Sequence, residues 1–264
     1  MKSLSLALLY SAFLLILMPV RSAAGVDPSQ IIDYTPVASY QIQVDFDPQA
    51  KHLSGTEVIR YNNTTTQPIP ELVFHLYLNA FRDSNSFFLM DTGGIHRSSR
   101  WTKEHPGWIV VQGIRQLDGT PLTFIEIEDG TLGRASLPDP IAPGETGEFE
   151  VIFAAQLPRV ISRTGFAGDF FMVGQWFPKL GVWENGSWNA HPFHSNAEFY
   201  ADFGVYEVEI TLPAVYKTAG SGVLVSRVDN ADGSQTVSYR AEAVIDFAWA
   251  ASPWPAWPVY RLAS

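Results

Sequence analysis

Short segments in which apolar and polar residues alternate recur along this chain, and they constrain the fold more than any other feature. In residues 39–47, Tyr40, Ile42, Val44 and Phe46 alternate with polar side chains. Because successive strand residues point to opposite faces of a sheet, this pattern indicates strands with one buried face. Similar segments follow at residues 56–63, 71–79, 107–117, 121–129, 147–156, 205–213, 222–230 and 235–243. With turn-forming pairs between them, they predict an all-β fold, an antiparallel β-sandwich.

The first residues predict a signal peptide over residues 1–24. Lys2 precedes an apolar stretch from about Leu4 to Met18, which is shorter than the roughly 20 residues that a bilayer span needs. Small residues follow, and we expect cleavage after Ala24. No later segment is apolar for long enough to span a membrane, so we expect a secreted or periplasmic protein, with an uncleaved anchor as the alternative.

Composition narrows the partners and the source of stability. The chain has no cysteine and a formal net charge of −10, which becomes more negative if Lys2 and Arg21 leave with the signal peptide. An exported chain without disulfides depends on its hydrophobic core. The acidic balance argues against nucleic acid and, after signal cleavage, against a membrane surface as a partner.

The mature chain is expected to contain one large domain. We assign residues 25–37 to an N-terminal extension and residues 38–253 to the β domain. Residues 254–264 form a tail rich in tryptophan and proline, and prolines so closely spaced cannot continue a sheet interior. We expect this tail to mark a truncated or frameshifted gene.

The segment 165–205 combines many aromatic residues with ionisable ones. His191, His194 and Glu198 offer two imidazoles and a carboxylate, the ligand types of a catalytic zinc site. Compact zinc motifs place both histidines on one helix, and Pro192 disfavours a helix here. We therefore expect no metal site, and these three residues remain its weak candidates.

Three tryptophans of this segment, Trp176, Trp183 and Trp188, allow two interpretations. They could form a stacking platform for a ligand, or they could fill the core of a sandwich that lacks disulfides, which is the interpretation we favour.

A group of carboxylates lies near the end of the alternating segment 121–129. Glu126, Glu128 and Asp129 could act as a general acid and base, but their position favours a solvated strand edge. There is also no G-x-S-x-G motif to support a serine nucleophile.

Several long segments together resemble one known family. They are YQIQVDFDPQAKHLSGTEVIRYNN, ELVFHLYLNAFR, GFAGDFFMVGQWFPKLGVWE, WNAHPFHSNAEFYADFGVYEVEITLP and AEAVIDFAWAASP. In content and order they resemble the N-terminal domain of the aminopeptidase N-like (gluzincin) zinc metallopeptidases, in their large bacterial branch. The resemblance implies a saddle-like antiparallel β domain that packs against a thermolysin-like catalytic domain and closes one side of its substrate cleft. Gln175, in VGQWFP, stands where a family glutamine reaches the free amino end of a peptide substrate.

The chain departs from the family in its catalytic parts. None of its six histidines lies in an H-E-x-x-H motif, and the Gly-rich exopeptidase strand is missing. We therefore expect no catalytic residue and no cofactor in this chain. Zinc is the cofactor of the full-length members of the family. We therefore predict a non-catalytic domain that has no peptidase activity by itself and that comes from a truncated or split gene. Its expected partner is a separately encoded catalytic domain. The alternative is a free-standing secreted module that binds peptide or glycan through the tryptophan-rich loop.

Overall fold

The computed structural model describes residues 35–196 and 199–253, and the structural statements below concern these residues. The predicted signal peptide, most of the N-terminal extension, the tail 254–264 and Glu198 lie outside them. Within the described ranges no helix has the length and apolar character needed to cross a bilayer.

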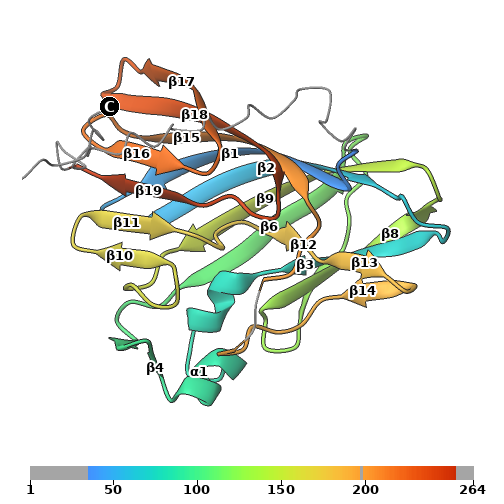
Figure 1. Ribbon diagram of the computed structural model, residues 1–264, viewed down its shortest axis with the longest axis horizontal. Coiled ribbons are helices and arrows are strands. Elements are labelled where there is room, and N and C mark those ends of the chain that lie inside the picture. The colour runs from blue at the N-terminus through green and yellow to red at the C-terminus, as the bar shows by residue number, and fades with distance from the viewer. Residues whose placement is uncertain (1–34, 197–198, 254–264) are drawn as a thin grey trace, which may run out of the picture. The chain divides into compact units, whose positions relative to one another are not determined.

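The largest unit is a seven-stranded sheet (Figure 1). Its strands, in spatial order, are β17 (Val223–Asp229), β18 (Ser234–Val244), β15 (Gly204–Pro213), β1 (Ala38–Asp47), β2 (His52–Asn62), β9 (Thr146–Gln156) and β6 (Trp108–Gln116). Strand β1 therefore lies at the centre, and β17 and β6 are the two edges.

Two four-stranded sheets lie on the inner side of this large sheet (Figure 1). One contains β10 (Gly165–Ala167), β11 (Phe170–Val173), β19 (Trp249–Ser252) and β16 (Lys217–Gly220). The other contains β12 (Lys179–Leu180), β3 (Ile69–His75), β8 (Leu132–Ile141) and β7 (Phe124–Ile127).

Small elements complete the described part. They are the hairpins β13 (Val182–Glu184) with β14 (Ser187–Asn189) and β4 (Ile95–His96) with β5 (Ser99–Arg100), a 3₁₀ turn η2 (Tyr77–Phe81) and a short helix α1 (Phe87–Thr92). The sandwich-like all-β fold expected from the sequence is confirmed.

One pairing departs from the expected antiparallel arrangement. Strand β1 pairs in parallel with β15, with Tyr40 opposite Tyr206. A parallel pair needs a long crossover connection, and here that connection contains the whole β12-β3-β8-β7 sheet together with β10 and β11 of the other small sheet. The alternation of apolar and polar residues along a strand indicates which face is buried. It does not indicate whether the neighbouring strand runs parallel or antiparallel.

The inner face of the large sheet forms the core with the smaller sheets. Tyr40, Ile42, Val44 and Phe46 are each at most 4% exposed, as the alternation predicted. The Phe46 ring contacts the Phe171 ring of β11, with centroids 4.9 Å apart. One continuous hydrophobic cluster thus joins the layers.

A glycine makes room for an aromatic ring at the centre of this core. Gly55 on β2 lies opposite Phe153 on β9, and a Cβ at Gly55 would lie 2.5 Å from the Phe153 ring. The ring therefore covers the glycine and reaches Trp176, with centroids 6.2 Å apart. This contact helps to position the segment after β11.

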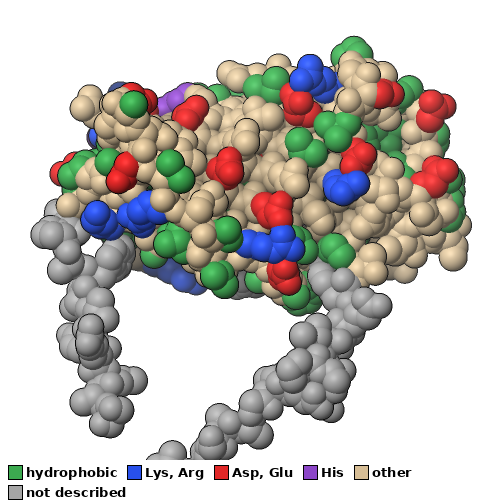
Figure 2. Space-filling view, turned by 90° about the horizontal axis from the view of Figure 1, so that it is seen from above, with side chains coloured by type: hydrophobic (Ala, Val, Ile, Leu, Met, Phe, Trp, Pro, Cys, Tyr) green, Lys and Arg blue, Asp and Glu red, His purple; other side chains and the backbone are tan. Residues whose placement is uncertain are grey.

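The outer face of the large sheet is polar. Gln41 and Gln43 on β1 donate hydrogen bonds of 3.1 and 3.2 Å to Glu207 and Glu209 on β15. In Figure 2, acidic, basic and apolar side chains are scattered over the face drawn, and no large area of a single charge appears on it.

Candidate functional site

The segment 174–178 connects β11 to β12 and contains the residue that the family resemblance singles out. Gln175 has a left-handed backbone (φ 60°) and is 4% exposed. Its side-chain oxygen Oε1 is buried without a hydrogen-bond partner. A non-glycine residue with positive φ and an unsatisfied buried acceptor both cost free energy, and such costs concentrate at functional sites.

Trp176 anchors this segment in the core. It is fully buried, and its indole N–H donates a hydrogen bond of 3.0 Å to the Phe247 carbonyl. Its ring meets Phe177 and Trp249 edge to face. Gln175 is therefore held next to a rigid aromatic anchor.

Lys179 follows in β12 and is nearly fully buried. Its Nζ lies 3.3 Å from Oδ2 of Asp246 and donates a hydrogen bond of 3.4 Å to the Ile245 carbonyl. It also lies over the rings of Tyr77 and Phe199, at 5.3 and 5.9 Å from their centroids. The ion pair and the ring contacts offset the cost of burying an ammonium group.

His75 on β3 lies directly opposite Lys179 in the strand pairing. Its ring stacks on Tyr77, with centroids 4.6 Å apart. Burial, together with the charges of Lys179 and His191, lowers the pKa of His75 to about 3. The imidazole is therefore neutral at physiological pH, and neither of its ring nitrogens has a hydrogen-bond partner.

The structure does not bring the weak metal candidates into one ligand set. Nδ1 of His194 lies 3.0 Å from Oδ2 of Asp91, and the His194 ring stacks on Phe87. His191 is exposed and lies within electrostatic reach of His75 instead. Glu198 is outside the described residues. Across residues 35–196 and 199–253, no group of three His, Cys, Asp or Glu is placed to hold a metal ion.

The tryptophans of this region do not form one platform. Trp176 is part of the core, whereas Trp183 and Trp188 are partly buried on the β13–β14 hairpin and meet edge to face at 5.5 Å. The Trp188 indole N–H is occupied by the Glu71 carbonyl at 2.9 Å. The geometry thus does not favour a ligand-stacking loop that includes Trp176.

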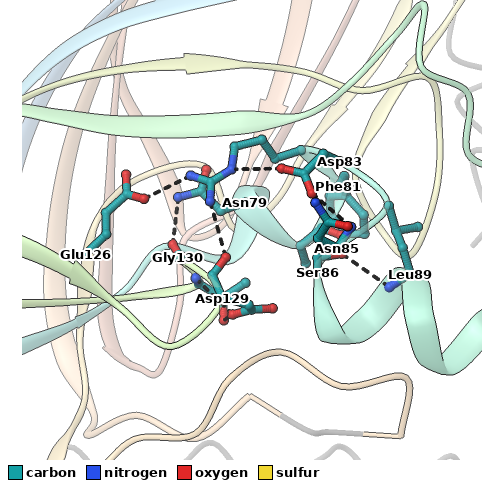
Figure 3. Close-up of polar contacts among 12 residues, drawn as sticks. Asn79, Phe81, Asp83, Asn85, Ser86, Leu89, Glu126, Asp129 and Gly130 are labelled. Atoms are coloured by element: carbon teal, nitrogen blue, oxygen red, sulfur yellow. Dashed lines mark hydrogen bonds and ion pairs between the residues drawn. The ribbon is translucent and has the colours of Figure 1, made fainter.

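The carboxylates near the end of β7 fasten two parts of the fold together (Figure 3). Glu126 accepts a hydrogen bond of 2.9 Å from Arg82, just after η2. Asp129 accepts one of 2.9 Å from the backbone N–H of Phe87, where α1 begins. Glu128 is exposed with a left-handed backbone (φ 56°). This arrangement on an edge strand is structural rather than that of an acid–base pair.

The buried group formed by His75, Lys179 and Asp246 was not predicted from the sequence. The available signal was the lone lysine within the apolar run of WFPKLGVW, because an isolated charge among apolar residues requires a buried partner.

Comparisons with known proteins place this geometry in a wider context. No protein-family profile matches the chain, and no curated protein matches it in sequence. Among solved structures, it is similar to an M1 zinc metallopeptidase from Deinococcus radiodurans, with a TM-score of 0.51 and 17% identity. It is also similar to a mutant two-domain M1 zinc metallopeptidase bound to L-arginine, with a TM-score of 0.52 and 16% identity.

Both similarities extend over 82% of this chain but only 42% of the metallopeptidase chain. A mutant of the Deinococcus radiodurans enzyme with a bound Tyr-Ser-Ala substrate is similar to the same extent, with a TM-score of 0.51 and 15% identity. The resemblance expected from the sequence is thereby confirmed at the level of the fold. The described chain has the fold of the N-terminal portion of M1 zinc metallopeptidases.

Proposed function

We propose that this chain is a non-catalytic N-terminal domain that closes one side of the substrate cleft of a zinc metallo-aminopeptidase. The fold likeness and its extent over 42% of the metallopeptidase chains support this role. The catalytic domain would be its partner, either encoded separately or present in a longer chain.

The observation that carries the proposal is the state of Gln175. Its Oε1 is buried and unpaired, and a carbonyl oxygen of this kind accepts hydrogen bonds from an ammonium group. A bound peptide with a free amino end would satisfy that acceptor and recover the free energy lost by burying it. The left-handed backbone at Gln175 sets the direction in which its side chain leaves the main chain.

Zinc would be held by the catalytic domain. Among the described residues no group of three His, Cys, Asp or Glu is placed to hold a metal ion, and His194 is paired with Asp91. What this chain contributes to the reaction is the binding and orientation of the peptide's amino end.

Activity assays on the purified chain test the non-catalytic role. With added zinc, we expect no hydrolysis of aminoacyl-anilides. Hydrolysis that requires zinc and disappears on chelation would contradict the proposal.

Reconstitution tests Gln175. The chain would be mixed with the catalytic portion of a two-domain M1 metallopeptidase, and activity would be measured on peptides with free and acetylated amino ends. We expect Gln175→Ala to lower kcat/KM for the free peptides about 10-fold, the effect of losing a hydrogen bond to a charged group. Gln112→Ala, on the exposed side of β6, is the matched control. Equal activity of both variants would exclude this role for Gln175.

A further inference from the structure

A carboxyl group lies in the hydrophobic core, on the inner face of β2. Glu57 is fully buried, and its neighbours in the strand pairing are Ile42 on β1 and Val151 on β9. Neither Oε1 nor Oε2 has a hydrogen-bond partner. By contrast, the buried ammonium group of Lys179 has both an ion pair and a carbonyl acceptor. A polar group left unpaired in the core costs free energy, so the position of Glu57 requires a physical explanation.

The segment 174–178 contacts the large sheet on both sides of β2. The Phe177 ring meets the Tyr40 ring of β1 edge to face, with centroids 5.8 Å apart. The Trp176 ring meets the Phe153 ring of β9, with centroids 6.2 Å apart. Because β2 lies between β1 and β9, the segment passes over β2.

The strand register shows where the segment crosses β2. Tyr40 lies opposite Ile59, and Phe153 lies opposite Gly55. Glu57 is midway between Ile59 and Gly55 on β2, and the side chains of alternate strand residues point to the same face. The line that joins the two ring contacts therefore crosses β2 at Glu57. The segment 174–178 is thus the cover of this carboxyl group.

No positive charge among the described residues compensates a carboxylate at this position. Tyr40 faces Glu57 from β1, and burial, followed by the charge of Glu57, raises the pKa of its hydroxyl. The β9 residues on this face are apolar, and the segment 174–178 contains no titratable residue. Lys179, the next residue along the chain, is paired with Asp246. Burial alone raises the pKa of Glu57, so its carboxyl group is stable here only in the neutral form.

The segment 174–178 is the part of this enclosure that opens most easily. Strands β1 and β9 are paired with β2 along its whole length, whereas the segment contains no regular strand or helix. Gln175 within it has a left-handed backbone and a buried acceptor without a partner. Displacing this segment therefore breaks fewer interactions than separating the strands of the sheet, and local openings follow such differences.

We propose that Glu57 is a proton-dependent latch on the segment 174–178. The segment is closed over the neutral carboxyl group, and ionisation of Glu57 displaces the segment so that water can hydrate the carboxylate. Because Gln175 lies in this segment, opening also moves its side chain, and the site becomes sensitive to pH. The link to substrate binding rests on the role proposed above for Gln175, whereas the latch itself does not.

The open state should become more populated as the pH rises. In the open state the carboxyl group is hydrated and titrates near its ordinary pKa of 4.5, and in the closed state it titrates well above that value. Below the lower of these two pKa values both states are protonated, and the segment stays closed. Between them, each pH unit should raise the ratio of open to closed molecules about 10-fold, as the release of one proton requires.

Thiol labelling measures this ratio, because the chain contains no cysteine of its own. Gln175→Cys places one buried thiol in the segment, and Val208→Cys, on the buried face of β15, reports unfolding of the whole domain. The labelling rate at each pH, divided by the rate of the same thiol in the urea-unfolded chain, gives the open fraction. We expect Gln175→Cys to be labelled faster than Val208→Cys, with an open fraction that rises about 10-fold per pH unit.

Variants of Glu57 in the Gln175→Cys background test whether this group is the latch. Glu57→Gln keeps the shape of the side chain and cannot ionise, so it should remove the pH dependence of the open fraction. Glu57→Leu should do the same and serves if the amide variant does not fold. Glu209→Gln, which changes an exposed carboxylate on β15, is the matched control and should keep the pH dependence.

Three results would overturn the proposal. The first is an open fraction of Gln175→Cys that does not change with pH. The second is an equal open fraction for both thiols, since ionisation would then unfold the whole domain. The third is a pH dependence that persists when Glu57 is replaced. None of these measurements involves a peptide or a catalytic domain, so their outcome is independent of the role proposed for Gln175.

Discussion

At the scale of single residues, two buried ionisable side chains define how this protein should respond to pH. His75 is 4% exposed and Glu57 is fully buried, and none of their polar side-chain atoms has a hydrogen-bond partner. Both groups are therefore neutral in the folded protein at a cost that depends on pH.

We expect His75→Phe to make the protein less sensitive to acid. The folded pKa of His75, about 3, lies below its ordinary value of 6.5, so the unfolded chain takes up a proton first as the pH falls. The wild type should therefore lose about 1.4 kcal/mol of unfolding free energy per pH unit below 6.5 through this group.

Phenylalanine keeps the stack on Tyr77 and cannot be protonated. Urea unfolding at pH 7, 5 and 4 measures the effect, with the partly exposed His52→Phe as the control. If the stability curves of His75→Phe and the wild type ran parallel, His75 would not be the source of acid sensitivity.

The contribution of Glu57 to stability changes with pH in the opposite direction. Burial raises its folded pKa well above 4.5, so the unfolded chain releases a proton first as the pH rises. Stability that is present below pH 4.5 should be lost by roughly 1.4 kcal/mol per pH unit until the folded pKa is reached. Glu57→Leu and the isosteric Glu57→Gln should both flatten this dependence. Chemical unfolding of the wild type and both variants at pH 5 and pH 8 measures this dependence. If each substitution changed the unfolding free energy by the same amount at both pH values, the prediction would be refuted.

At the scale of elements, the Lys179–Asp246 ion pair ties β12 to the connection between β18 and β19. The Lys179 side chain is 2% exposed and that of Asp246 is 24% exposed. Removing one partner of a buried pair leaves the other charge uncompensated, so we expect Lys179→Met to cost about 3 kcal/mol of unfolding free energy.

Denaturant midpoints check this prediction. Adding Asp246→Leu to Lys179→Met should recover much of the loss, because the uncompensated carboxylate is then gone. Arg60→Ala, which breaks an exposed pair with Glu148, should change stability by less than about 1 kcal/mol. A Lys179→Met protein as stable as Arg60→Ala would show that the pair contributes little.

Strands with one buried face could be predicted from the sequence because their side chains alternate, as in β1, β9, β15 and β18. Strand β8 was not predicted, because Gly133, Pro138 and Pro140 interrupt the alternation of apolar and polar residues and are typical of turns. The segment 71–79 was expected to be one strand, but β3 ends at His75 and a 3₁₀ turn follows, because buried residues occupy both faces there. The shortest strands carry too few residues to show any period.

At the scale of the whole molecule, the sequence predicts a site in the segment around Gln175 but does not predict the contacts that these residues make with distant parts of the chain. The resemblance singled out Gln175, whose buried and unpaired oxygen only a structure can show. The pairing of His194 with Asp91 joins residues 103 positions apart, and no local spacing reports such a contact.

An exposed apolar edge leads to a prediction about association. All residues of β17 are exposed, and Val223, Val225 and Val228 are 70%, 63% and 56% exposed on this edge strand. Unprotected edges of this kind pair with other chains, so we expect reversible self-association of the purified chain. Sedimentation velocity over a concentration series would detect it.

Lysines on the edge should suppress this association by charge repulsion and solvation. Val223→Lys with Val225→Lys should therefore yield a monomer, whereas Val215→Lys, which changes an equally exposed valine outside the strands, should not. A wild-type chain that stays monomeric at all concentrations would disprove the prediction.

The parallel pairing of β1 with β15 also has a consequence for the order of folding. The side-chain contact between Gln41 and Glu207 joins residues 166 positions apart. The central strand of the large sheet therefore cannot acquire one of its two neighbours until most of the chain has emerged from the ribosome. Contacts so distant in sequence slow folding. The nascent chain should therefore remain accessible to proteases and chaperones for longer than a chain whose sheet is built from successive hairpins.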